Sequence, residues 1–246
     1  MTYRPREFWE QRLTEQFDLR GTGETGMPLA YNRACYALRR DVLTRALAAQ
    51  GVTPSGKTVL DVGCGTGFFV DYYSSRGARV TGLDLAAVSV ERLRARFPEA
   101  RFLQGDISET ELAERFDIVN VFDVLYHIVD EVRWESAVRR LARATKPGGL
   151  MLVTDLFTDS DGLAEHNRIR PLERYRELLE AEGLTIGPRY PTHVLLNTDL
   201  GPLRFLNRAP GLLRAIDQVL LRVGAGGGAN HLLVSRRPLT AGPSGG

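Results

Sequence analysis

The chain has 246 residues, of which 43% are hydrophobic and 25% are charged, with a formal net charge of +2 at pH 7. This length and composition predict one α/β domain with embellishments and a sizeable core, as in ordinary soluble globular proteins. The nearly balanced charge argues against a dominant polyanion-binding surface, although local charged patches stay open.

Cys35 and Cys64 are the two cysteines of the chain. They provide neither a disulfide framework nor the spacing of a zinc site, so we expect no metal and a reducing, cytoplasmic environment. The first residues lack the apolar core of a signal peptide, and no apolar run is long enough to span a bilayer. The sequence therefore predicts a cytoplasmic protein with no membrane partner.

Residues 1–56 precede the first predicted strand and show helical periodicity. Gly21 to Pro28 forms a glycine-rich break between two predicted helices. We therefore expect a helical N-terminal extension with a hinge at this break. Apolar residues recur at helical spacing on both sides of the break: Phe8, Trp9, Leu13 and Phe17, then Cys35, Leu38, Val42 and Ala46.

The stretch from Thr58 to Val70 reads TVLDVGCGTGFFV. Its apolar start, which ends at Asp61, predicts a buried strand that reaches its carboxyl edge. Glycines at alternate positions then permit a sharp turn and a close approach of a ligand to the main chain, with a helix N-terminus behind it. A tight turn without a ligand is the alternative. This spacing differs from the G-x-G-x-x-G of dinucleotide sites, which disfavours a nicotinamide dehydrogenase.

A second predicted strand runs from Gly77 to Asp84. A carboxylate at the tip of this strand, roughly twenty residues beyond the glycine turn, can accept hydrogen bonds from both ribose hydroxyls of a nucleoside. Leu85 would then lie against the base. The alternative is that Asp84 caps the next helix.

The segment from Arg101 to Asp155 continues the alternation of strands and helices. A short strand and a Gly-Asp turn end at Ile107, and a fourth strand covers 116–123. The next helix stops at a Lys-Pro-Gly-Gly sequence, which precedes a fifth strand at 150–155.

These motifs, taken in order over residues 57–155, resemble the class I S-adenosylmethionine (SAM) methyltransferases. The resemblance rests on D-x-G-x-G-x-G at 61–67, Asp84, Phe-Asp-x-Val at 116–119, the Tyr126-His127 pair and Lys-Pro-Gly-Gly at 146–149. It implies a Rossmann-like α/β fold over 57–240, with a seven-stranded, mostly parallel sheet, helices on both faces and an antiparallel last strand. It also implies that the extension at 1–56 folds over the cofactor as a lid.

The resemblance implies SAM as cofactor and S-adenosylhomocysteine as product. An acidic residue at Asp106 would bond the adenine amino group while Ile107 packs on the ring, and a plain Asx turn is the alternative. Arg33 is a candidate for the carboxylate of the cofactor, and Tyr31 and Tyr36 are candidates for closing the pocket. The cofactor-binding residues expected in full are Asp61, Gly63, Cys64, Gly65, Gly67, Asp84, Leu85, Asp106, Ile107, Phe122, Arg33 and Tyr31.

Methyl transfer from a sulfonium is an in-line displacement, so the protein mainly supplies geometry and a closed site. A base is needed only for an acceptor that is protonated at the working pH. His127 is the leading candidate because imidazole titrates near neutrality. Asp123 and Tyr126 are lesser catalytic candidates, and Asp123 could instead hold the amino group of the cofactor.

The acceptor is less well defined. The Asn/Asp-Pro-Pro-Tyr/Phe motif typical of nucleic-acid amino methyltransferases is absent after the fourth strand, so we expect a small-molecule acceptor methylated on O or N, and no nucleic acid. The alternatives are a cyclase-like enzyme that uses SAM differently and a non-catalytic SAM-binding module. We expect the chain to be a monomer or homodimer. Five arginines could bind an acidic acceptor, and the alternative is that they are ordinary solvated surface residues. They are Arg168, Arg170, Arg189, Arg204 and Arg208.

The last part of the chain predicts two strands and an insertion. Residues 184–196 and 231–236 read as the sixth and seventh strands. Residues 197–228 form the insertion between them, with a helix at 212–223. The glycine-rich tail at 241–246 is expected to be disordered.

Overall fold

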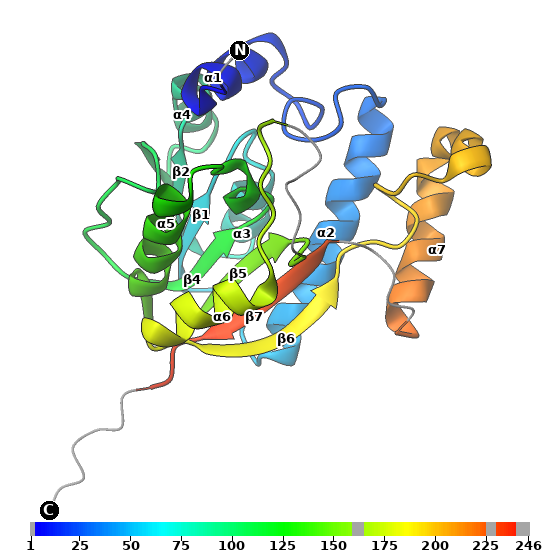
Figure 1. The fold of residues 1–246 in the computed structure, drawn as a ribbon. Coiled ribbons are helices and arrows are strands. Elements are labelled where there is room, and N and C mark those ends of the chain that lie inside the picture. The colour runs from blue at the N-terminus through cyan, green and yellow to red at the C-terminus, as the bar shows by residue number, and fades with distance from the viewer. Residues whose placement is uncertain (1–2, 159–164, 225–229, 240–246) are drawn as a thin grey trace, which may run out of the picture.

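A computed structural model describes residues 3–158, 165–224 and 230–239. Its centre is a seven-stranded sheet with the order β3-β2-β1-β4-β5-β7-β6 (Figure 1). The first five strands pair in parallel and β7 pairs antiparallel with both β5 and β6, as predicted. The strands are β1 (Thr58–Val62), β2 (Arg79–Asp84), β3 (Arg101–Gln104), β4 (Phe116–Val121), β5 (Thr145–Asp155), β6 (Thr185–Pro191) and β7 (His231–Arg236).

Helices cover both faces of the sheet, and alternate residues of each strand enter two separate cores. Val59 of β1 belongs to the core under α2 (Leu29–Ala49), α3 (Phe68–Ser74) and α4 (Ala87–Arg96). Its neighbour Leu60 enters the core under the helices of the other face. Those helices are α5 (Glu131–Arg143) and α6 (Leu172–Ala181). The period-two alternation of the strands therefore builds a three-layer domain.

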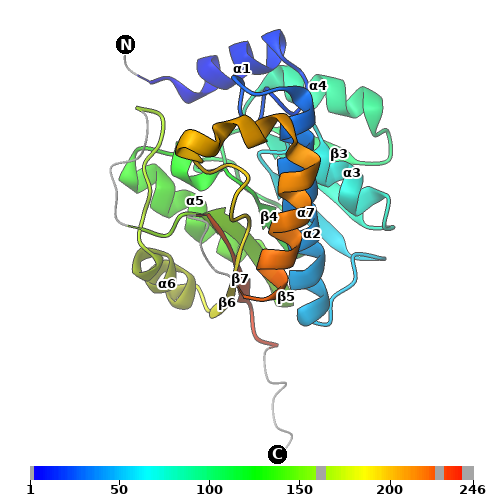
Figure 2. The same ribbon diagram turned by 90° about the vertical axis from the view of Figure 1, so that its right-hand side faces the viewer.

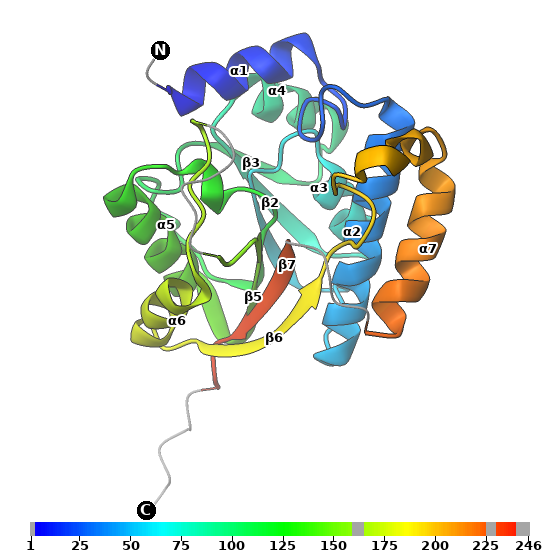
Figure 3. The same ribbon diagram turned by 45° about the vertical axis from the view of Figure 1, so that its right-hand side comes forward.

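The predicted extension at 1–56 divides into two helices with different roles. Leu38, Val42 and Leu43 of α2 are almost fully buried in the main core, so α2 is a permanent layer of the domain. α1 (Pro5–Glu15) instead lies across the end of the molecule next to α4 (Figure 3). The Glu10 carboxylate of α1 accepts hydrogen bonds from the first backbone N–H groups of α4, which has no side-chain cap of its own. This contact fixes α1 to the domain.

Two of the family motifs hold the strands together at the opposite end from the glycine turn. The Asp117 carboxylate accepts from the backbone N–H and hydroxyl of Thr58 and from Lys146 Nζ, at 2.7–3.1 Å. A Cβ at Gly149 would come within 3.0 Å of the carbonyl oxygens of Lys146 and Asp117. The Phe-Asp-x-Val and Lys-Pro-Gly-Gly sequences therefore join the beginnings of β1, β4 and β5 and have a structural role.

Several element boundaries differ from the sequence prediction: β2 begins two residues later than predicted and β4 ends two residues earlier. β5 begins at Thr145 because this residue already pairs with Phe116 of β4. β6 ends at Pro191 and does not continue to 196, because buried Asp217 accepts the backbone N–H groups of Leu195 and Leu196. α7 begins at residue 210, two residues before the predicted helix.

The predicted insertion consists of a 3-10 helix, η2 (Gly201–Arg208), and α7 (Pro210–Arg222). α7 packs on the outer side of α2, where Arg214 forms an ion pair with Asp41 (Figure 2). Within the three described ranges, no helix combines the length and the apolar character needed to cross a membrane. The predicted tail at 241–246 lies outside the described residues.

Candidate functional site

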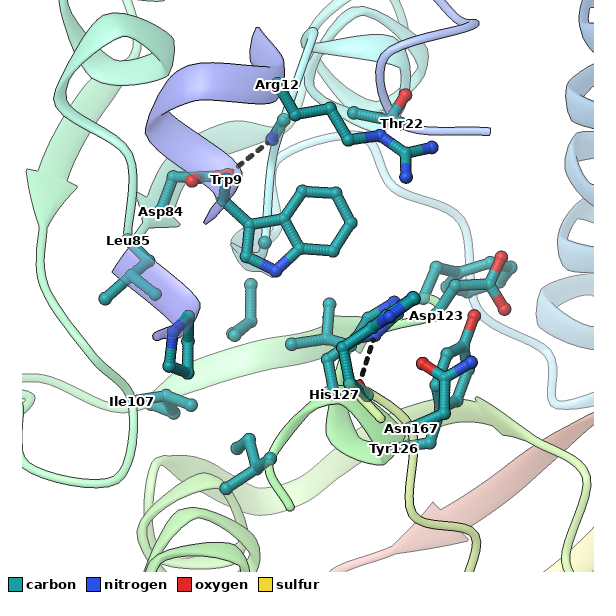
Figure 4. Close-up of a pocket in the computed structure, with 18 of the residues that line it drawn as sticks. Trp9, Arg12, Thr22, Asp84, Leu85, Ile107, Asp123, Tyr126, His127 and Asn167 are labelled. Carbon is teal, nitrogen blue, oxygen red and sulfur yellow. Dashed lines mark hydrogen bonds between the residues drawn. The ribbon is translucent and has the colours of Figure 1, made fainter. Parts of the chain in front are cut away.

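A cavity of about 710 Å³ lies at the carboxyl ends of β1, β2 and β4, beneath α1. This is the edge at which open α/β sheets bind their ligands. The cavity has the size of a typical small-molecule site. Figure 4 shows Trp9 of α1 pointing into the cavity, between Asp84 on one side and His127 on the other.

The glycine turn forms one wall of the cavity. Gly63, Gly65 and Gly67 all have positive φ angles, between 51° and 81°, a conformation that costs little only for glycine. A Cβ on Gly63 would lie 2.4 Å from a methyl carbon of Val124, and one on Gly65 would lie 2.6 Å from a methyl carbon of Thr22. The main chain of exposed Gly63 and of buried Gly65 lines the cavity, where a ligand can approach the backbone.

Asp84 ends β2 at the cavity wall and is 6% exposed. Its two carboxylate oxygens accept from the backbone N–H groups of Gly65 (2.7 Å) and Ala86 (2.9 Å). Burial raises the pKa of this carboxyl despite these bonds. Asp84 therefore ties the glycine turn to Ala86, the residue before α4, and also faces the cavity beside Leu85. It does not cap α4, whose first N–H groups donate to Glu10.

Asp106 and Ile107 lie next to each other on the cavity wall after β3. Asp106 Oδ1 accepts from the backbone and hydroxyl of Ser108, so the expected alternative, an Asx turn, is present. Its other oxygen accepts from Arg133 at 2.8 Å. Burial acts to raise the pKa of Asp106, but the bonds from Ser108 and Arg133 outweigh it and the pKa is lowered. This carboxylate is therefore ionised at neutral pH.

Asp61 lies directly behind the cavity wall and does not line it. Asn120 Nδ2 donates to Asp61 Oδ1 at 2.7 Å, whereas Oδ2 is buried with no hydrogen-bond partner. Burial, opposed by the Asn120 bond and assisted by the nearby charge of Asp84, raises the pKa of Asp61 to about 7. An unpartnered buried carboxylate oxygen at the glycine turn fits a site that receives a cationic or hydrogen-bond-donating ligand.

We expect Asp61→Asn to stabilise the ligand-free protein at alkaline pH. The folded-state pKa of about 7 lies above the ordinary value of 3.8, so the folded protein binds more protons than the unfolded chain between these values. The free energy of unfolding therefore falls as the pH rises between these two pKa values, and Asp61 accounts for at most about 4 kcal/mol of this decrease. Asparagine removes the charge, so the stability difference between variant and wild type should grow from pH 5 to pH 8 in urea titrations. A constant difference would contradict the raised pKa.

Asp123 forms an ion pair with Arg39 of α2 at the inner end of the cavity. Arg39 Nη2 lies 2.9 Å from Asp123 Oδ2, and the side chains are only 11% and 17% exposed. Asp123 Oδ1 accepts from Thr154 and Asn230 at 2.9 and 3.0 Å. Three donors thus share the Asp123 carboxylate, which holds Arg39 beside the cavity that both residues line.

Tyr126 and His127 follow on the 3-10 turn η1 (Leu125–His127) and both line the cavity. Burial raises the pKa of Tyr126 well above 10, so its hydroxyl is a hydrogen-bond donor and not a base. Burial lowers the pKa of His127 to about 4, so its ring is neutral at pH 7. His127 Nδ1 lies 3.2 Å from the backbone oxygen of His166, which can only accept. Nδ1 therefore carries the proton and Nε2 the lone pair.

The structure brings most of the predicted site residues to the cavity and leaves others away from it. Arg33 is exposed and does not line the cavity, and Tyr31 is buried and accepts from the backbone of Asn197. The Cys64 sulfur packs against β2, and Gly67 packs against Leu93, so both serve the turn itself. The predicted site residues that line the cavity are Tyr36, Gly63, Gly65, Asp84, Leu85, Asp106, Ile107, Phe122, Asp123, Tyr126 and His127.

The five arginines considered for an acidic acceptor do not line the cavity. Arg168 and Arg170 form ion pairs with Glu131, and the other three are exposed. Arg12 and Arg39 line it instead. The Arg12 guanidinium donates to the Gly21 carbonyl at 2.7 Å and thereby joins α1 to the loop before α2.

Sequence reasoning missed several residues of the acceptor end. The sequence does contain a spacing that indicates two of them. Arg12 lies three residues after Trp9, and Arg39 lies three residues after Tyr36, so each pair shares one helix face. The cavity-lining residues not predicted from the sequence include Trp9, Arg12, Arg39, His166, Asn167 and Asn197.

Residues 59–149 match the model of a methyltransferase domain. The chain is 34% identical over 158 residues to a malonyl-[acyl-carrier protein] O-methyltransferase of Serratia marcescens, which covers 58% of this chain and 59% of that one. It is 38% identical over 125 residues to a ubiquinone biosynthesis O-methyltransferase of Alkalilimnicola ehrlichii, 48% of each chain. The chain thus spans about half of the length of the curated relatives that it matches.

The fold is that of the N-methyltransferase NodS from Bradyrhizobium japonicum, solved with S-adenosylhomocysteine. The TM-score is 0.63 at 18% identity, over 94% of this chain and 99% of that one. The sheet order, the glycine turn and the matched domain define an α/β methyltransferase domain. Residues 59–149 thus form a methyltransferase domain, and the fold is that of SAM-dependent methyltransferases, as the sequence motifs indicated.

Proposed function

We propose that the protein transfers a methyl group from SAM to an oxygen or nitrogen atom of a small molecule. The observation that carries this proposal is one continuous cavity that joins the carboxylates Asp84 and Asp106 to the neutral imidazole of His127. Such a cavity can hold an adenosyl cofactor at one end and an acceptor at the other. SAM supplies an activated methyl group when bound.

The residues of this chain fit the cofactor in three places. Asp84 faces the position of the ribose, while Asp106 and Ile107 offer a hydrogen-bond acceptor and an apolar surface to the adenine. The main chain of Gly63 and Gly65, with the Asp61 carboxyl behind it, suits the methionine part. Leu85 and Phe122 add apolar surface to the same wall.

The acceptor end is mainly aromatic and holds the imidazoles of His127 and His166, which are able to take a proton. Trp9 packs edge-on to His127, and His127 stacks on His166. The lone pair of His127 Nε2 can accept the proton that a hydroxyl or amine loses during transfer. Both curated relatives described above are named as O-methyltransferases, which favours oxygen. A biosynthetic role in the cytoplasm, as a monomer or homodimer that does not act on nucleic acid, is part of this proposal.

Calorimetric titration with SAM, S-adenosylhomocysteine and NAD tests the cofactor. We expect binding of the two adenosyl ligands in the micromolar range, about −8 kcal/mol, and none of NAD. Methyl-labelled SAM then tests the reaction on candidate acceptors. Label in the product supports methyl transfer, whereas turnover without label would indicate a non-methylating use of SAM. In the titration, no binding of either adenosyl ligand would contradict the proposal.

We expect His127→Ala to lower kcat by about 100-fold or more, the usual range for loss of a general base, while SAM affinity changes little. His127→Gln is the matched variant, because it preserves a polar side chain but cannot accept the proton. The wild-type pH profile should show loss of activity only toward the low pKa of about 4, where the imidazole becomes charged. Full turnover by either variant on the true acceptor would remove the base role.

A further inference from the structure

One face of the η2–α7 insertion is apolar and exposed. On α7, Leu212, Ile216 and Val219 lie on one helical stripe and are 56%, 38% and 57% exposed. Val223, just beyond the helix, continues this stripe at 73%. Their spacing of three and four residues places all of them on one side. Exposed Leu203 and Phe205 of η2 extend the insertion's apolar surface. We call these six residues the insertion face.

The opposite side of α7 already has its partner. Leu213, Asp217 and Leu221 are buried toward α2 and the loop after β6. The packing of α7 on the domain therefore does not need the residues of the insertion face, and α7 is the outermost layer beyond α2 (Figures 1 and 2). An outward stripe of large apolar side chains on an otherwise ordinary surface indicates a binding surface.

The charges around the insertion face are positive. Arg204, Arg208 and Arg222 are exposed and form no ion pair among the described residues. Of the two acidic residues between 197 and 223, Asp217 is buried. A second copy of the chain would bring these like charges together if it used the same face, which opposes a symmetric dimer here.

Apolar side chains bordered by unpaired arginines on a convex outer helix match a membrane surface with anionic headgroups. Such helices bury the apolar stripe at the level of the headgroups, while their basic residues attract the negative lipids. η2 also lies at the end of the molecule that carries α1, and its chain follows soon after Asn197, a residue of the cavity wall (Figure 3). We propose that the insertion face docks the protein reversibly on an anionic membrane surface.

This inference modifies the expectation of no membrane partner, because it concerns a surface contact and no spanning segment. It does not depend on the proposed reaction. A catalytically inactive protein with this insertion would bind the same surface.

Vesicle co-sedimentation of the full chain tests the proposal with two lipid compositions. Vesicles of phosphatidylcholine with phosphatidylglycerol should bind the wild type, and pure phosphatidylcholine vesicles should bind it at least about tenfold more weakly. The double variant Leu212→Glu/Val219→Glu should lose about tenfold or more in binding to the anionic vesicles. Both positions are exposed, so circular dichroism should show an unchanged fold.

Val132→Glu is the matched control. Val132 is 78% exposed on α5, on the side of the domain away from α7 (Figure 1), and its substitution should leave vesicle binding unchanged. No binding of the wild type to anionic vesicles would overturn the proposal, as would equal binding by the double variant. Analytical ultracentrifugation adds a further outcome. If the wild type is a dimer and the double variant is a monomer, the insertion face binds a second copy of the chain, and the proposal is overturned.

Discussion

Replacement of Asp123 by alanine is expected to lower the free energy of unfolding by about 3–5 kcal/mol, the cost of leaving a buried charge without its partner. The Arg39 side chain is 11% exposed, and its guanidinium forms an ion pair with Asp123. The same substitution removes the acceptor for Thr154 and Asn230. It also places alanine at a φ of 57°, which is unfavourable for that residue. Urea unfolding at neutral pH measures the loss.

Two further variants separate these causes. Asp123→Asn introduces a residue that tolerates positive φ and can still accept from Thr154. Its decrease in the free energy of unfolding therefore reports the lost charge alone and should be smaller than that of Asp123→Ala. The double variant Asp123→Ala/Arg39→Met removes both charges and should be more stable than Asp123→Ala alone. Equal stability of the single and double variants would show that Arg39 is not the source of the cost.

The Asp123–Arg39 pair also shows what the sequence could not reveal. Asp123 stood out because it follows a predicted strand, but its partner comes from α2, at a place set only by the packing of α2 on the sheet. The sequence therefore indicated a candidate catalytic carboxylate, and the structure adds an ion pair that the local pattern does not contain. Tertiary contacts between distant segments decide such roles, and a local pattern cannot show them.

The glycine turn and the strand-end acids could be predicted because each depends on local backbone chemistry. Gly63 and Gly65 have the positive φ angles and close contacts that only glycine allows, and Asp84 sits at the tip of β2 as its strand pattern indicates. The structure places Arg33 away from the cavity, because its position depends on tertiary packing. The prediction of Arg33 as a cofactor-binding residue depended on how α2 packs next to the cavity. In the structure, Tyr36 and Arg39 of α2 line the cavity, whereas Arg33 is exposed to solvent.

We expect Asp84→Ala to weaken SAM binding by more than about tenfold, or about 1.4 kcal/mol, since hydrogen bonds to a charged group contribute about 1.5–3 kcal/mol each. Two effects add here. The variant removes the acceptor for the ribose hydroxyls, and it frees the backbone N–H of Gly65, which Asp84 holds at 2.7 Å. The glycine turn would then lose part of its preorganised shape. Calorimetric titration with SAM and with S-adenosylhomocysteine measures the change.

Asp71→Ala provides the matched control, because Asp71 is an exposed acid on α3 that does not line the cavity, and its loss should leave affinity unchanged. Thermal unfolding of both variants without ligand distinguishes a weakened turn from a lost ligand contact. If Asp84→Ala binds SAM as tightly as the wild type, Asp84 does not contact the cofactor. If its affinity falls while its ligand-free unfolding temperature stays near that of wild type, the carboxylate acts on the cofactor directly, and the raised pKa of Asp84 reflects a buried site that the ribose hydroxyls complete.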